Sequence, residues 1–246
     1  MTGIVLINMR KVVVMIALVS MMLTGCGSRL PAARQAVISF TFDDAPYQDW
    51  DVIKPILDGA GIKAGFAVPS SFPDGQKTLS WVQVKELQDD GNEIIAYTMD
   101  RSHLGPLPRS AQVDQIDNRS VYERHGVHVR GFAYPFGEFD DQQIPIVKHY
   151  YDYALATDRP GTPATAVPLD VYKIRRTSVT GRSSTRDLFN AIDAAVAHND
   201  LLVFVVNSAE WPFMDGGAKK LSDTIAHAQA KKVRIATPSA AIAMSQ

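Results

Sequence analysis

Acidic residues are missing from the first 25 positions of this chain, and cysteine is nearly missing from all of it. A single cysteine among 246 residues excludes an internal disulfide framework and any cysteine-rich zinc module. The formal net charge is −1, so no basic excess favours nucleic acid as a partner. Hydrophobic residues make up 46% and charged residues 21%, which excludes disordered, collagen-like and coiled-coil chains. This length and composition suit one α/β barrel.

The acid-free beginning has the pattern of a secretory signal. Its only basic residues are Arg10 and Lys11, and an almost wholly apolar run over 12–23 follows them. That run is shorter than the ~20 residues needed to span a bilayer. A short basic start followed by a short apolar core predicts a cleaved signal peptide over 1–25.

The single cysteine, Cys26, stands where this signal would be cut. The preceding Leu-Thr-Gly resembles the lipobox of bacterial lipoproteins, in which the new terminal cysteine is acylated. The resemblance implies a palmitate-bearing anchor and tether over 26–35 before a domain over 36–246. It also implies a lipid-anchored protein of the bacterial cell envelope, facing the periplasm, and Gly27 favours the outer membrane. A plain signal peptide with an incidental cysteine is the alternative.

Strand and helix patterns alternate along the rest of the chain. β-Branched and aromatic runs predict strands at 36–42, 63–68, 93–97, 129–134, 153–156, 170–174, 201–206 and 233–236. Helical spacing predicts helices at 50–57, 80–91, 111–124, 144–151, 185–198 and 218–231, and from Ser239 onward. This order predicts an α/β fold with a parallel sheet and helices outside it, and the number of strands favours a barrel.

In such barrels the chemistry lies at the carboxyl ends of the strands. Polar and turn-forming residues stand at several of these ends. They are Asp43 and Asp44, Tyr97 to His103, Tyr134 to Gly137, Arg176, which follows the predicted sixth strand, and Asn207. We therefore expect these groups to share one site.

Two of these segments carry a family resemblance. Thr41-Phe42-Asp43-Asp44 resembles the first motif of the NodB-homology polysaccharide deacetylases, carbohydrate esterase family four. The segment over 132–137, Phe-Ala-Tyr-Pro-Phe-Gly, resembles the third motif, and Asp170 and Arg176 match the fourth. The resemblance covers about 37–243 and implies a distorted (β/α)7-type barrel.

The resemblance also implies a reaction and a set of roles. Family members hydrolyse the N-acetyl amides of polysaccharides with a water bound to a metal, which one Asp and two His hold. Asp43 would be the base and Asp44 the metal ligand. The backbone N–H of Phe136 would stabilise the oxyanion, while Asp170 and Arg176 would complete the catalytic set.

The chain departs from the family at three histidine positions. Tyr97 and Arg101 stand where the metal-binding histidines belong, and Asn207 stands where the catalytic acid belongs. A guanidinium cannot release its charge, so Arg101 suits a divalent ion poorly as a neighbour. We expect Arg101 to pair with Asp43 or Asp44 and fill the vacated metal position, and hydrolysis to be lost or altered.

Two alternatives remain open. In the first, Asp44, Asp100 and His103 form a rearranged metal site, and the protein is an active metal-dependent polysaccharide N-deacetylase. In the second, the barrel is only a scaffold for a non-catalytic envelope adaptor. No cofactor is expected unless the site is active, in which case it takes a divalent metal such as zinc. The residues expected to contact the glycan are Tyr97, Arg101, Tyr134, Pro135, Asn207 and Trp211.

Overall fold

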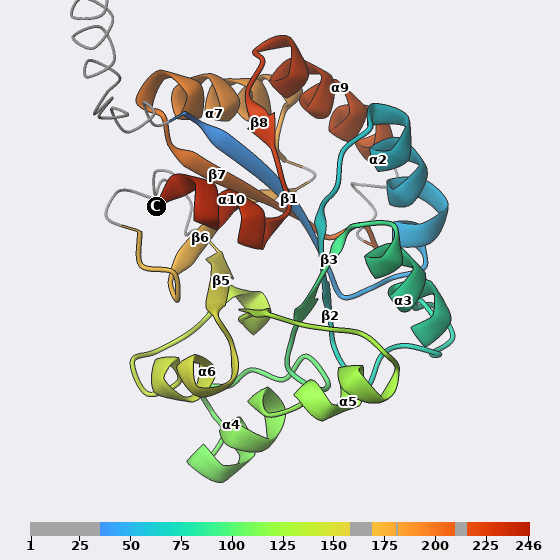
Figure 1. Ribbon diagram of the computed structural model, residues 1–246, viewed down its shortest axis with the longest axis vertical. Helices are drawn as coiled ribbons and strands as arrows, with labels where there is room; N and C mark the ends of the chain where they lie inside the picture. Colours follow the sequence, from blue (N-terminus) through green and yellow to red (C-terminus); the bar gives the residue numbers. More distant parts are fainter. Residues whose placement is uncertain (1–34, 158–168, 181, 210–215) are drawn as a thin grey trace, which may run out of the picture. The chain divides into compact units, whose positions relative to one another are not determined.

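The computed structural model describes residues 35–157, 169–180, 182–209 and 216–246. Within this part, seven parallel strands close into a barrel in the order β2-β3-β4-β5-β6-β7-β1, and β1 pairs back to β2 (Figure 1). The strands are β1 (Val37–Asp43), β2 (Gly65–Val68), β3 (Glu93–Ala96), β4 (Gly131–Ala133), β5 (Tyr153–Thr157), β6 (Ile174–Val179) and β7 (Leu201–Val206). A two-residue strand, β8 (Arg234–Ile235), pairs beside β1. The expected barrel fold is confirmed, whereas the signal segment, Cys26 and most of the tether lie outside the described residues.

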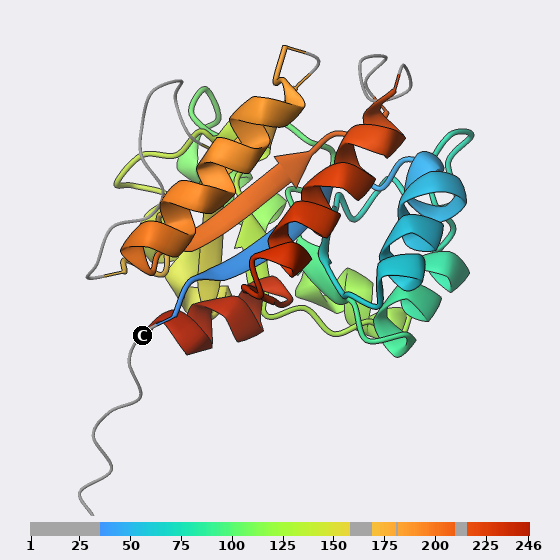
Figure 2. The same ribbon diagram turned by 90° about the horizontal axis from the view of Figure 1, so that it is seen from above.

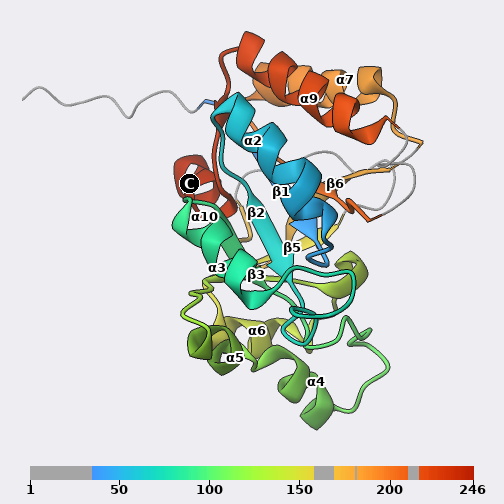
Figure 3. The ribbon, with the colours of Figure 1, turned by 90° about the vertical axis from the view of Figure 1, so that its right-hand side faces the viewer.

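Helices surround the barrel. They are η1 (Asp49–Ile53), α2 (Lys54–Ala60), α3 (Trp81–Asp89), α4 (Arg109–Ile116), α5 (Arg119–Arg124), η2 (Pro135–Gly137), α6 (Ile144–Tyr150), α7 (Thr185–His198), α9 (Gly217–Ala230) and α10 (Pro238–Ser245). Figure 2 shows α7 and α9 lying side by side, and Figure 3 shows α9, α2 and α3 following one another along the outside. No helix in the described ranges is both long enough and apolar enough to cross a membrane.

Alternation along β1 explains how a carboxylate enters the barrel. Ile38, Phe40 and Phe42 belong to the large core between the strands and the outer helices. The residues between them face the other way, because successive side chains of a strand point to opposite faces. Val37 belongs to the inner core, and Asp43 ends this inward row at the carboxyl end of the strand.

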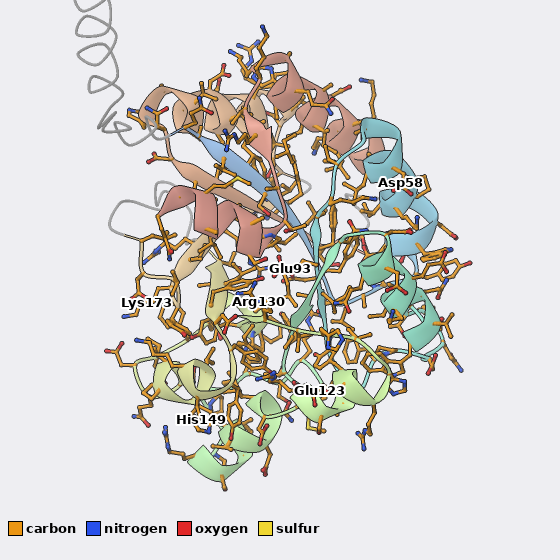
Figure 4. The ribbon with its side chains drawn as sticks, in the orientation of Figure 1. Asp58, Glu93, Glu123, Arg130, His149 and Lys173 are labelled. Carbon is orange, nitrogen blue, oxygen red and sulfur yellow. The ribbon has the colours of Figure 1, made fainter. Side chains whose placement is uncertain are left out.

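The opposite, amino end of the barrel is filled by α10. Ala241 and Ile242 of this helix pack in the inner core. Glu93, at the start of β3 (labelled in Figure 4), accepts hydrogen bonds from the Tyr153 hydroxyl and the Ser239 backbone N–H, both at 2.8 Å. This contact ties α10 to the strands and helps it to cover the amino end of the barrel.

Two predicted elements were wrong. The sixth strand was expected over 170–174 but covers Ile174–Val179, because the Asp170 carboxylate accepts the Tyr172 N–H and forms a turn before the strand. Arg176 consequently lies within β6 instead of following it. The expected helix over 111–124 is divided at Asn118, whose buried side chain donates to the Tyr97 carbonyl at 2.7 Å.

Candidate functional site

A cleft of about 240 Å³ opens at the carboxyl end of the barrel. Its residues come from the ends of β1, β3, β5, β6 and β7 and from η2. They are Asp43, Asp44, Tyr97, Arg101, Phe136, Gly137, Thr157, Ser178, Val179, Thr180, Val205 and Asn207. The expectation that polar residues at separate strand ends share one site therefore holds for most of them.

A buried ion pair forms the floor of this cleft. Arg176 is 0% exposed and holds both oxygens of Asp43, with Nη1–Oδ1 at 2.6 Å and Nη2–Oδ2 at 2.9 Å. The same guanidinium donates through Nε to the Ala156 carbonyl at 3.1 Å and through Nη1 to the Thr41 hydroxyl at 3.2 Å. Such two-point contacts fix the carboxylate plane as well as balancing its charge.

The second carboxylate, Asp44, has weaker partners. Its Oδ2 accepts a hydrogen bond from the Asn207 amide at 3.0 Å, and Arg101 Nε lies 3.1 Å from its Oδ1. The Arg101 contact is an ion pair without hydrogen-bond alignment, since neither atom has a hydrogen-bond partner among the described residues. Burial, and then the charge of Asp43, raises the pKa of Asp44 from 3.8 to about 6, against the opposing effects of Arg101, Asn207 and Arg176. This carboxylate is therefore largely ionised at pH 7 and takes up a proton as pH falls through about 6.

Tyr97 follows β3 and is 2% exposed. Its backbone is fixed by α5, because its N–H donates to the Tyr122 hydroxyl at 3.2 Å and its carbonyl accepts from Asn118. Burial raises the pKa of the Tyr97 phenol, and the charges of Asp43 and Asp44 add to this effect. The phenol therefore faces the acidic pair in its neutral form.

The mouth of the cleft carries a small stack of side chains. The Arg101 guanidinium carbon lies 5.1 Å from the centre of the Phe136 ring, and the His103 ring stacks on Phe136 at 3.8 Å. His103 Nδ1 in turn lies 3.0 Å from Glu138 Oε2. Since a cation is attracted to an aromatic face, Phe136 helps to hold Arg101 against the cleft.

Left-handed backbone conformations gather around this site. Asp44, Arg101 and Phe136 have φ values of 77°, 65° and 57°, which non-glycine residues seldom adopt. Gly137 follows at φ 72°, and a Cβ there would lie 2.5 Å from the backbone nitrogen of Thr157. These loops therefore hold costly conformations that bring several side chains into the cleft, a feature often associated with functional sites.

A divalent metal does not fit the residues present. Both oxygens of Asp43 accept from Arg176, Asn207 donates to one oxygen of Asp44, and a fixed guanidinium faces the other at 3.1 Å. Tyr97 supplies a neutral phenol where the family has an imidazole. In the part of the chain that the structure describes, no three His, Cys, Asp or Glu side chains come together as metal ligands.

The proposed rearranged site is also not assembled among these residues. Asp100 accepts from the Ser102 hydroxyl at 2.6 Å, and His103 contacts Glu138, so both face partners other than Asp44. The expectation that Asp44, Asp100 and His103 share a metal is therefore not met in this arrangement. Arg101 instead pairs with Asp44, one of the two partners that the sequence suggested.

Other predicted site residues lie apart from the cleft. Tyr134 is 0% exposed and stacks on Phe139 in the core, and Pro135 is buried beside it. Asp170 precedes the amino end of β6, whereas the cleft forms at the carboxyl end. Its assignment to the catalytic set came from the resemblance to the family's fourth motif, of which Arg176 reaches Asp43 and Asp170 does not line the cleft. Trp211 lies outside the described residues.

Several residues at the carboxyl end of the barrel were not predicted from the sequence. Thr157, Ser178 and Thr180 bring hydroxyl groups from β5 and β6, and the correct strand ends would have pointed to them. Asp49 is 0% exposed behind the acidic pair, where Ser208 donates to its Oδ1. Burial raises the pKa of Asp49 strongly, and nothing in the local sequence distinguishes it from a surface acid.

Comparison with known proteins assigns this chain to a family. Residues 31–153 match the sequence family of the polysaccharide deacetylases. The chain therefore belongs to the polysaccharide deacetylase family, as the motifs around Asp43 and Phe136 implied. No curated protein matches the sequence.

Solved structures of this fold are similar at low sequence identity. A carbohydrate esterase domain of a xylanase from the hindgut metagenome of Trinervitermes trinervoides has 13% identity and a TM-score of 0.62, over 85% of this chain and 90% of that one. The Streptococcus pyogenes deacetylase PplD, solved with acetate, has 20% identity and a TM-score of 0.56, over 67% and 73%. A family pseudoenzyme from Bacillus anthracis has 13% identity and a TM-score of 0.59, over 85% and 66%. At these identities the likeness establishes the fold alone.

Proposed function

We propose that this protein binds N-acetylated polysaccharide in its cleft without hydrolysing it by a metal-bound water. The arrangement around Asp44 carries the proposal. Arg101 Nε lies 3.1 Å from Asp44 Oδ1, so a permanent positive charge stands where the family requires a metal ion. A base needs a nucleophile to act on, and in the described part of the cleft no group replaces the metal that would activate water.

The rest of the cleft suits a sugar ligand. Thr157, Ser178 and Thr180, at or just after the ends of two strands, line it, and Phe136 is 43% exposed at its mouth. Sugars bind through such combinations of polar groups and aromatic surface. Loss of hydrolysis within the same fold also has a parallel, because one similar structure is described as a pseudoenzyme and another as its mutant with restored activity.

The test measures glycan binding and turnover by the full chain. N-Acetylhexosamine oligomers are titrated by calorimetry, and acetate release is followed with and without added zinc or cobalt. Thr180→Trp, which places an indole in the cleft, is expected to abolish binding. The matched control is Met244→Trp, on the exposed side of α10 at the far end of the barrel. Metal-dependent acetate release by the wild type, or binding that survives Thr180→Trp, would overturn the proposal.

We further propose that the barrel is carried on the bacterial envelope by a lipid on Cys26. The support is the acid-free, apolar segment over 12–23 and the position of the only cysteine directly after it. More than one acyl chain gives stable anchoring, whereas one alone is marginal. Cells expressing the chain are labelled with radioactive palmitate, and Cys26→Ala is expected to lose both label and membrane association. Membrane association that persists unchanged in Cys26→Ala contradicts a lipid anchor at this position.

A further inference from the structure

We infer that the cleft distinguishes N-acetylated sugars from sugars with a free amine, and that Arg101 is the residue that makes the distinction. The inference rests on the proposed glycan binding and adds to it a selectivity. It follows from the position of one guanidinium, from the charge balance of the cleft and from the chemistry of the two ligands.

Arg101 presents unused donors to the ligand. Its side chain is 38% exposed and lines the cleft, and its Nε faces Asp44. The terminal Nη1 and Nη2 groups make no hydrogen bond with any residue in the described ranges, and the guanidinium carbon lies 5.1 Å from the centre of the Phe136 ring. An arginine in this situation can donate to an acceptor oxygen in the cleft without breaking an existing hydrogen bond.

The acidic pair offers little to a cationic ligand. Arg176 balances Asp43 through two short hydrogen bonds, and Arg101 balances Asp44. Two carboxylates and two guanidiniums leave these four side chains without net charge. The next acid along the η2 loop, Glu138, pairs with His103 and does not line the cleft. A protonated sugar amine would therefore lose water beside Arg101 without gaining an unpaired carboxylate.

An acetamido group has the complementary chemistry. Its carbonyl oxygen can accept a hydrogen bond from a guanidinium. Because the acetamido group is neutral, this contact adds no charge to the cleft. Its methyl group needs apolar contact, and Val205 and the Phe136 ring both line the cleft. Acetylation thus replaces a repelled cation with an acceptor and a methyl group that match the residues present.

The experiment compares two ligands that differ only in acetylation. The full chain is titrated with N-acetylhexosamine oligomers and with the same oligomers after chemical N-deacetylation, at a pH where the free amine is protonated. The wild type is expected to bind the acetylated form at least about tenfold more tightly, the size of one hydrogen bond to a charged group. Mass spectrometry of the recovered ligand checks that it remained intact.

Substitutions of Arg101 then assign the preference. Arg101→Met removes the donors and leaves the Asp44 charge unbalanced, so the preference is expected to disappear or invert. Arg101→Lys keeps the positive charge and is expected to retain part of the preference for the acetylated form. Arg130→Met is the control, because Arg130 (labelled in Figure 4) precedes the amino end of β4 and pairs with Asp152 away from the cleft.

Each outcome has a separate meaning. Equal binding of both oligomers by the wild type overturns the inference, and so does a preference that Arg101→Met leaves unchanged. If neither oligomer binds the wild type, the proposed glycan binding itself fails. Should Arg101→Met not fold, which its thermal unfolding would show, Arg101→Gln removes the charge with a smaller change of polarity and decides the question in its place.

Discussion

Arg176 donates two hydrogen bonds to Asp43, with Nη1–Oδ1 at 2.6 Å and Nη2–Oδ2 at 2.9 Å, from a side chain that is wholly buried. The pair joins β6 to the end of β1 across the barrel interior. Two further acceptors, the Ala156 carbonyl and the Thr41 hydroxyl, satisfy the same guanidinium. A buried charge with so many partners is costly to leave unpaired.

Arg176→Met is therefore expected to destabilise the protein more than most single changes. Removing one partner of a buried pair costs about 3–5 kcal/mol, because the other charge stays buried. The free energy of unfolding in urea measures the loss. The double variant Asp43→Leu/Arg176→Met removes both charges and is expected to recover part of it. A single variant as stable as the wild type would show that the pair contributes no net stability.

The sequence predicted the barrel because its core strands are apolar or β-branched. Leu201–Val206 is buried throughout, and its apolar run showed this directly. The sixth strand was misplaced because Ile174–Val179 contains two arginines, which are unusual in a barrel strand. One of them, Arg176, is buried because Asp43, far away in the sequence, neutralises its charge. An apolar pattern cannot reveal a compensated buried charge.

The site was predictable to the extent that strand ends and motif positions were visible. Asp43, Asp44, Tyr97, Arg101, Phe136 and Asn207 all reach the cleft. The sequence allowed two carboxylate partners for Arg101. In the structure Arg176 holds both oxygens of Asp43, and Arg101 pairs with Asp44. Asp49 could not be found from the sequence, since its burial depends on packing against Ser208, which lies far along the chain.

Asp44 should make stability depend on pH. Its pKa is raised from 3.8 to about 6 in the folded state, so the folded protein binds this proton more tightly than the unfolded chain. The resulting stability is complete below pH 3.8 and is lost as pH rises through 6. At ~1.4 kcal/mol per unit, the loss is of the order of 3 kcal/mol.

Asp44→Asn removes this titration while keeping an acceptor for Asn207. Relative to the wild type, the variant is expected to gain stability as pH rises from about 4 to about 7, and to show no gain below about pH 4. Urea unfolding across this range measures the difference. A difference that does not change with pH would mean that Asp44 is not titrating in this range.

Gly137 should tolerate no side chain. A Cβ at this position would lie 2.5 Å from the Thr157 backbone nitrogen, and its φ of 72° disfavours other residues. Gly137→Ala is expected to cost about 1–3 kcal/mol through strain and displacement of the η2 loop. Gly105→Ala is the matched control, because a Cβ at Gly105 would meet no atom within 4 Å. Equal stability of the two variants in thermal unfolding would contradict the tight packing at Gly137.

Restoring imidazoles at the family positions should create a metal site. In Tyr97→His/Arg101→His the fixed positive charge is gone, and two neutral nitrogen ligands face Asp44, whose Oδ1 has no hydrogen-bond donor among the described residues. One Asp and two His are a common set of zinc ligands that leaves a position open for water. The double variant is expected to bind zinc at 1:1 stoichiometry in calorimetry, and a further Asp44→Ala change is expected to abolish this binding. Arg101→His alone should bind more weakly, because Tyr97 keeps a neutral phenol in the other ligand position. If the wild type bound zinc as tightly as the double variant, Arg101 would not be what keeps the metal out, and the charge balance around Asp44 would have to be reinterpreted.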